Sequence, residues 1–128
     1  GHLPKRHLTI DWRAVRKYAE QALKGLNIDI DVTRTMRELS VVERQIVEIA
    51  RAVSGDAKIL VMDEPTAALT PKEVDKLFEV VGRLKARGVG IIYVSHRLDE
   101  IFRVADRVQV LRDGKHVASK TIREVTPK

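Results

Sequence analysis

The chain has 128 residues, of which 44% are hydrophobic and 33% charged, a composition typical of one folded domain that excludes a disordered chain. No run approaches the roughly 18 apolar residues that a membrane span needs, and the absence of cysteine excludes disulfides and thiolate metal sites. The net charge of +6 permits a nucleic-acid or anionic-membrane partner, but the basic residues are scattered and only five residues are aromatic, which favours dispersed, solvated charge.

The first part of the chain predicts an irregular lead-in followed by one helix. Residues 1–9 show no periodicity. Asp11 can cap a helix over residues 12–24, with Tyr18 and Leu23 on its apolar face and Gly25 as its end.

The connector over residues 26–35 has the spacing of a calcium loop but lacks its key positions. Asn27, Asp29 and Asp31 are its possible oxygen ligands, and Glu38 stands at the twelfth position counted from Asn27. However, Val32 stands where the sharp turn requires glycine, and Arg34 puts a positive charge inside the loop. Calcium binding is therefore rejected.

Two capping boxes predict the starts of two longer helices. Ser40 with Glu43 begins a helix that extends to about residue 53, and Thr70 with Glu73 begins one that ends at Gly88. Apolar, β-rich runs at 59–62 and 90–94 flank the second helix. A strand–helix–strand order predicts parallel pairing, so both strands end at the same edge of the sheet.

The strand over residues 59–63 is expected to be buried on both faces, because its four apolar residues follow one another without alternation. Asp63 and Glu64 stand at its carboxyl end and Pro65 ends it. Such a pair is typical of a magnesium–nucleotide site, where the first acid holds the metal through water and the second orients an attacking water. The alternative is a strand that ends in a solvated acidic turn.

His96 ends the second strand on the same edge, so we expect its imidazole to converge with the two carboxylates. The alternative for His96 is a residue at a helix start that bonds locally. A short helix through residues 98–105 and a hairpin with an Asp113-Gly114 turn complete the predicted elements, before a polar tail.

Taken in order, these segments resemble the second half of an ABC-type ATPase domain. Residues 39–45 match its signature loop, 59–63 its Walker B strand and 67–70 its D-loop, while Glu64 matches the catalytic glutamate and His96 the switch histidine. The resemblance implies an α/β fold: a partial P-loop NTPase domain with a parallel sheet core flanked by helices. Residues 1–38 would be a lead-in and part of the helical subdomain. Residues 39–128 would be the C-terminal part of the ATPase core, ending in the hairpin.

The resemblance also implies roles for individual residues, with ATP and Mg²⁺ as cofactors. Asp63 would hold the water shell of Mg²⁺, Glu64 would polarise the attacking water, and His96 would donate to the γ-phosphate. Residues of the signature loop and the D-loop would act in trans, on nucleotide held by an opposite ATPase half: Ser40, Val42, Glu43 and Thr70.

The signature loop departs from the family pattern Leu-Ser-Gly-Gly-Gln. Val41, Val42 and Glu43 replace the two glycines and the glutamine, and β-branched residues do not allow the close phosphate approach that glycine allows. We expect this loop to support the opposite site weakly, and Val42→Gly to raise ATPase activity. Thr70 replaces the usual D-loop aspartate, which preserves helix capping but not a carboxylate contact.

Residues 63–70 are similar to the first ATPase half of ribose- and galactose-type sugar importers. That resemblance implies a second ATPase half, transmembrane permease subunits and, indirectly, a sugar-binding protein as partners. It also implies a location at the cytoplasmic face of the cell membrane, and no nucleic-acid partner is expected. Two alternatives stay open: a nucleic-acid- or ribosome-associated ATPase of the same superfamily, and a non-catalytic partner ATPase domain.

The chain contains no Gly-x-x-x-x-Gly-Lys-[Ser/Thr] phosphate loop, because its one Gly-Lys pair, at Gly114, is followed by His116. We therefore expect a fragment of a longer ATPase that does not hydrolyse ATP by itself. Strand edges left open by missing strands predict self-association.

Overall fold

The computed structural model describes residues 5–6, 9–55 and 57–125, with side chains from residue 10 onward. Its elements, in chain order, are β1 (Lys5–Arg6), β2 (Thr9–Ile10), α1 (Trp12–Gly25), the 3₁₀ turn η1 (Met36–Glu38), α2 (Val41–Val53), β3 (Ile59–Asp63), α3 (Pro71–Ala86), β4 (Gly90–Val94), α4 (Leu98–Val104), β5 (Arg107–Arg112), β6 (Lys115–Thr121) and the 3₁₀ turn η2 (Ile122–Glu124).

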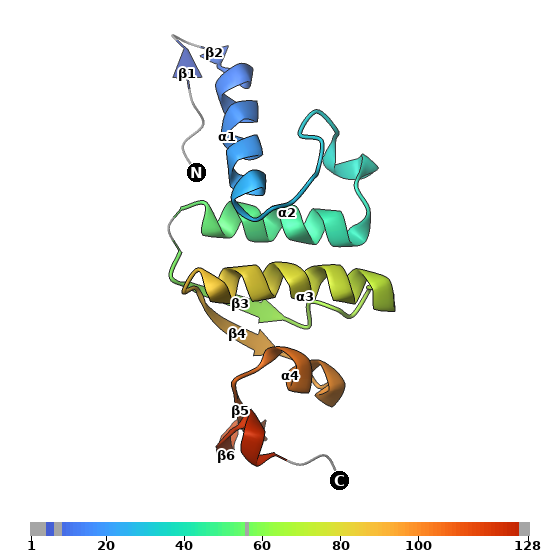
Figure 1. Cartoon of the computed structure of the whole chain (residues 1–128), viewed down its shortest axis with the longest axis vertical. Coiled ribbons are helices and arrows are strands. Elements are labelled where there is room, and N and C mark those ends of the chain that lie inside the picture. The colour runs from blue at the N-terminus through green and yellow to red at the C-terminus, as the bar shows by residue number, and fades with distance from the viewer. Residues whose placement is uncertain (1–4, 7–8, 56, 126–128) are drawn as a thin grey trace.

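The central pair of strands, β3 and β4, is parallel and in register from Ile59↔Gly90 to Asp63↔Val94. Helix α3 connects them, as the strand–helix–strand pattern predicts. The predicted α/β arrangement, with a parallel pair of strands and a C-terminal hairpin, is confirmed in these elements. In Figure 1 the carboxyl ends of β3 and β4 lie on the same side of the view as the first turns of α2 and α3.

One face of the β3–β4 pair packs on helices, and this is where the core lies. Leu60 and Met62 of β3 are buried against residues from α2 and α3. The most completely buried of these partners come from α3: Leu77, Val81 and Leu84. Burial of a Leu or Val side chain contributes about 1.5–3 kcal/mol, so the contact between α3 and the strands holds the two carboxyl ends together.

The opposite face of the same two strands is open, which corrects the expectation that β3 is buried on both faces. Ile59 and Val61 are each 63% exposed, and Ile92 and Val94 are 53% and 47% exposed. The apolar run of β3 therefore alternates in burial, because helices cover only one of its faces within the described chain.

The N-terminal segment differs from its predicted form in two ways. Lys5–Arg6 pairs with Thr9–Ile10 in a short antiparallel ladder where we expected an irregular lead-in. Helix α1 begins as predicted, with Asp11 accepting from the Ala14 N–H at 3.0 Å. However, Tyr18 is 55% exposed, and Leu23 is the buried residue of this helix.

The C-terminal hairpin of β5 and β6 is confirmed. Arg112 pairs with Lys115 across the turn, and positive φ angles at Asp113 (50°) and Gly114 (72°) fit a two-residue type I′ connection. Across the described residues, every helix is too short or too polar to cross a bilayer.

Candidate functional site

The candidate site lies where β3 and β4 end side by side. Asp63 is in register with Val94, so the residues that follow each strand leave the sheet at one edge. Ligands of open α/β sheets bind at such carboxyl edges.

Glu64 takes up a conformation that is uncommon for a residue with a side chain. Its φ of 44° lies in the left-handed region. Two main-chain bonds hold it there: its N–H donates to the Val94 carbonyl at 2.9 Å, and its carbonyl accepts from the Ala67 N–H at 3.2 Å. Such a conformation persists when its surroundings enforce it, and it is often found at functional sites.

The Glu64 carboxylate and the His96 imidazole form a direct pair, which confirms the predicted convergence for Glu64. Oε1 of Glu64 lies 2.8 Å from Nδ1 of His96 and also accepts from the His96 N–H at 3.2 Å. When the Glu64 carboxylate is ionised it can only accept, so this contact then requires a hydrogen on Nδ1 and leaves Nε2 for another partner. The imidazole is 82% exposed and the carboxylate side chain 36%, so both are open to a ligand.

Asp63 is exposed at the same edge, at the end of the open face of β3. The described residues hold no cluster of three or more His, Asp or Glu side chains that suits a metal ion. A single carboxylate nevertheless fits Mg²⁺, which is commonly bound by one or two carboxylates together with water and substrate phosphates.

A surface hollow of about 310 Å³ reaches this edge from helix α2. Its walls come from one side of α2, from Leu60 to Asp63 on β3, and from Pro65. Apolar side chains make up part of these walls, and Asp63 of the acidic edge is one of the lining residues.

The start of α2 is a reciprocal capping box, as predicted. Ser40 Oγ accepts from the Glu43 N–H at 3.3 Å, and Glu43 Oε2 accepts from the Ser40 N–H at 2.7 Å. This main-chain bond, assisted by the charge of Arg34, lowers the pKa of Glu43. Arg34 lies 3.3 Å from the Glu43 carboxylate and also donates to the Glu38 carbonyl, so the negative charge of this loop is partly balanced.

Val42 is only 3% exposed and packs within the core. Its side chain therefore cannot face a nucleotide, and a contact from this position stays a prediction for the main chain alone. Val41, at 40% exposed, carries the accessible side chain of this loop.

Thr70 begins α3 with half of the predicted box. Its N–H and its hydroxyl both donate to Glu73 Oε2, at 2.9 and 2.8 Å, but its side chain makes no capping bond to the helix. Both Thr70 and Ser40 are exposed. They precede the first turns of α3 and α2, which lie on the same side of the view as the carboxyl ends of β3 and β4 (Figure 1).

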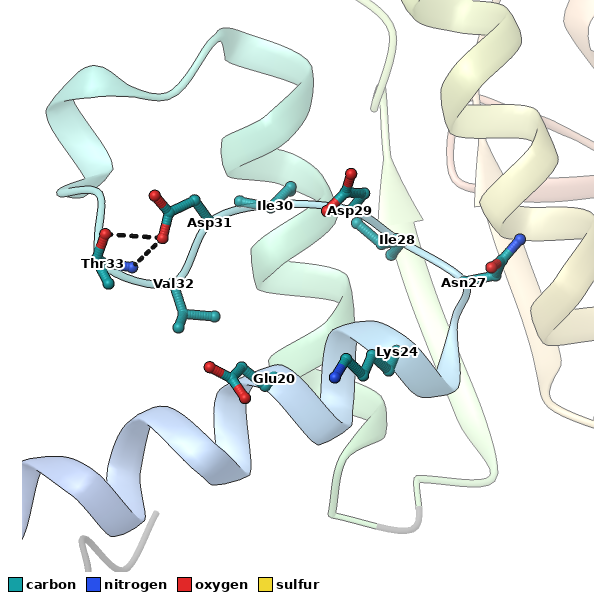
Figure 2. A pocket seen from close by; sticks show the side chains of 9 residues that line it. All are labelled: Glu20, Lys24, Asn27, Ile28, Asp29, Ile30, Asp31, Val32 and Thr33. Carbon is teal, nitrogen blue, oxygen red and sulfur yellow. Dashed lines mark hydrogen bonds between the residues drawn. The ribbon is translucent and has the colours of Figure 1, made fainter.

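A larger hollow, of about 460 Å³, lies away from this edge, between α1 and the loop over residues 27–33 (Figure 2). Asp31 accepts from both the N–H and the hydroxyl of Thr33, at 2.8 and 2.7 Å. These bonds lower the pKa of Asp31. They make a local turn of the loop that sequence spacing had likened to a calcium site.

Sequence reasoning missed a buried carboxylate behind the edge. Glu100 on α4 is 1% exposed and bonds to Thr66, which is equally buried. A weak signal existed, because Glu100 stands next to Ile101 and four residues before Val104, on the apolar side of the short helix.

A family comparison identifies this architecture. Residues 3–67, half of the chain, match the model of a family described as ABC transporter. The chain belongs to the ABC transporter family. The resemblance of the sequence to ABC-type ATPases is thereby confirmed at the level of the family.

Curated ABC relatives include sugar importers. The chain is 50% identical over 119 residues to the ribose import ATP-binding protein RbsA of Lacticaseibacillus paracasei, covering 93% of the chain and 24% of that protein. It is 43% identical over 122 residues to the galactose/methyl galactoside import ATP-binding protein MglA of Sodalis glossinidius, covering 95% of the chain and 24% of the relative. The chain thus spans about a quarter of the length of these relatives.

Solved ABC structures share the fold. MJ1267, an ATP-binding cassette of an ABC transporter, superposes with a TM-score of 0.77 at 30% identity, over 94% of this chain and 47% of that one. CbiO1 of Clostridium perfringens, part of the ABC transporter complex cbiONQ, gives the same TM-score at 26% identity, over 92% and 47%.

Proposed function

We propose that this chain carries one part of the catalytic apparatus of a sugar-importing ABC ATPase, with Glu64 and His96 as its hydrolytic pair. The observation that supports this most strongly is the 2.8 Å contact between these two side chains at the carboxyl edge of parallel strands. The phosphate loop would come from residues outside this sequence, so the chain alone would not hydrolyse ATP.

In the proposed reaction, Glu64 orients and polarises the water that attacks the γ-phosphate of ATP. His96 would act as the imidazolium, donating its Nδ1 hydrogen to Glu64 and its Nε2 hydrogen to the phosphate oxygens on which charge develops. Asp63 would hold Mg²⁺ through bound water, and that ion would neutralise phosphate charge.

The same proposal divides the chain into two regions of an ABC ATPase domain. Residues 39–128 would form the C-terminal part of the ATPase core, and residues 1–38 a lead-in and part of the helical subdomain. Ser40 and the main chain at Val42, with Glu43 close by, would meet nucleotide held by an opposite ATPase half. The exposed position of Ser40 at a helix start supports this, because helix N-termini present free N–H groups to anions. Thr70 would contribute to the same interface.

The sugar class and the partners rest on the named relatives. Ribose import and galactose/methyl galactoside import are the functions of the two similar proteins, so we propose a pentose or hexose as the imported substrate. Permease subunits, a second ATPase half and, indirectly, a sugar-binding protein would be the partners, with the ATPase held at the cytoplasmic face of the membrane.

The test uses a hybrid ATPase, in which this chain replaces the matching 119 residues of the Lacticaseibacillus paracasei ribose import protein. We expect the hybrid to hydrolyse ATP and Glu64→Gln to lower kcat about a hundredfold or more, as loss of a general base does. Asp113→Asn, in the hairpin turn, is the matched control and should keep full activity. A Glu64→Gln hybrid as active as the control would contradict the proposal and favour a non-catalytic partner domain.

A further inference from the structure

The loops that carry Glu64 and His96 share one buried partner, Glu100. Its side chain is 1% exposed, and a fully buried carboxylate is rare unless it is paired. Glu100 lies in the first turn of α4, which follows His96 in the chain.

Glu100 bonds to residues from both loops. Thr66, two residues after Glu64, donates its hydroxyl to both carboxylate oxygens at 2.7 Å. From the other side, the Tyr93 hydroxyl donates at 2.7 Å, the Arg97 guanidinium lies 2.9 Å away, and the Ser95 hydroxyl lies 3.4 Å away.

We propose that Glu100 is a positioning residue for ATP hydrolysis, which fixes the Glu64 carboxylate against the His96 imidazole by bonding Thr66 of the loop after β3 and, on the other side, Tyr93 of β4 and Arg97 of the loop after β4. This proposal rests on the proposed function. Glu100 is buried behind the carboxyl edge of β3 and β4 and would not contact the reacting atoms, so it would act through these partners.

The conformation of Glu64 explains why such a link is needed. A left-handed residue with a side chain is held only by its surroundings. The main-chain bond to Val94 fixes Glu64 from the strand side, and the bond from Ala67 closes the turn that follows. Thr66 fixes the other end of the same turn by its bond to Glu100. If that bond is lost, the turn gains freedom while the strands stay paired.

The groups around Glu100 are hydrogen-bond donors, so the residue at position 100 has to be an acceptor. Burial and the contact with Glu100 raise the pKa of Tyr93, so its hydroxyl stays a donor. Arg97 is a donor only, and the Thr66 hydroxyl donates here as well. A glutamine at position 100 would present an amide group with two N–H donors to this set, leaving at least one buried donor without an acceptor.

Two substitutions at Thr66 separate positioning from packing. Thr66→Ser keeps the hydroxyl and removes a methyl group, whereas Thr66→Val keeps the volume and removes the hydroxyl. If Thr66 only fills space, Ser is the more damaging change; if its bond to Glu100 positions Glu64, Val is.

In the hybrid ATPase we expect Thr66→Val and Glu100→Gln to lower kcat about tenfold to a hundredfold with little change in the KM for ATP, as a misplaced catalytic group does. Thr66→Ser should stay within about threefold of the parent. Asp75→Asn is the control for the docking of α4, because Asp75 pairs with Arg103 of α4 at 2.7 Å on the exposed side.

A second readout uses the 128-residue chain itself and needs no hydrolysis. The His96 N–H, which donates to Glu64, should exchange with solvent about tenfold faster in Thr66→Val and Glu100→Gln than in Thr66→Ser and Asp75→Asn. Equal exchange in all four variants, or a Thr66→Val hybrid as active as Thr66→Ser, would overturn the positioning role. An active Glu64→Gln hybrid would instead overturn the proposed function, while the exchange comparison would still decide whether Glu100 links the two loops.

Discussion

Val41 and Val42 are neighbours in the signature loop but face opposite environments, one 40% exposed and the other 3% exposed. Replacing Val42 by glycine removes a core side chain and adds a flexible residue to the first turn of α2, so we expect Val42→Gly to lower the free energy of unfolding by about 3 kcal/mol. Val41→Gly should cost about 1 kcal/mol or less. Urea unfolding of the chain measures both.

The difference in burial between Val41 and Val42 changes how to test the hypothesis that this signature loop supports the opposite ATP site weakly. A gain of ATPase activity in a Val42→Gly hybrid would have to appear despite lost stability, whereas Val41→Gly relaxes the loop without opening the core. Equal destabilisation by the two substitutions would contradict the packing assigned to Val42.

Acid should destabilise the chain through its helix caps. Hydrogen bonds from Ser40 and Thr70 lower the pKa values of Glu43 and Glu73. A carboxylate with a lowered folded-state pKa contributes stability above its unfolded value, and this contribution is lost as the pH falls through the folded value. The free energy of unfolding should therefore decrease as the pH drops below about 4.5.

The caps can be separated from other carboxylates by substitution. Glu73→Gln should weaken the acid dependence measured by urea unfolding between neutral and acidic pH. Glu79→Gln, which removes an exposed pair with Arg83 on the same helix, is the control and should leave that dependence nearly intact. An unchanged acid dependence in Glu73→Gln would count against the cap.

Two glycines of the α3 region should respond oppositely to alanine. Gly82 lies within α3 and Gly88 follows its end with a φ of 81°, and an added Cβ meets nothing within 4 Å at either position. The two positions therefore differ only in their backbone conformation. Gly82→Ala should stabilise the chain by about 0.5–1 kcal/mol and Gly88→Ala should destabilise it by about 1–2 kcal/mol. Thermal unfolding shifts of the same sign would show that the turn at Gly88 is wrongly described.

Self-association stays a prediction, now tied to a defined surface. The open face of β3 and β4 gathers Ile59, Val61, Ile92 and Val94, and large exposed apolar patches promote association. Val61→Lys should shift the chain toward monomer in sedimentation velocity. Val117→Lys is the control, because Val117 has a similar exposure of 60% but lies on the hairpin. A larger effect of the control would move the interface to the hairpin.

The sequence predicted the parallel pair and the meeting of Glu64 with His96, because strand–helix–strand order determines at which edge both strands end. It could not predict the open face of β3. An apolar run signals that both faces are suited to burial, but the presence of a second covering layer depends on other parts of a fold.

The Glu100 network was also beyond the sequence. A glutamate in a short amphipathic helix is normally solvated, and its burial here depends on Thr66, which lies 34 positions away in the chain. Likewise, the two-residue ladder of β1 and β2 is too short for periodicity to register.

The most direct test of the central claim is a double-mutant cycle on kcat in the hybrid ATPase, with Glu64→Gln, His96→Ala and the two combined. If the 2.8 Å pair works as one hydrolytic unit, each single change lowers kcat and the double variant loses little more than Glu64→Gln alone. A double variant whose loss equals the product of the two single losses would show that the residues act independently, which would contradict the account.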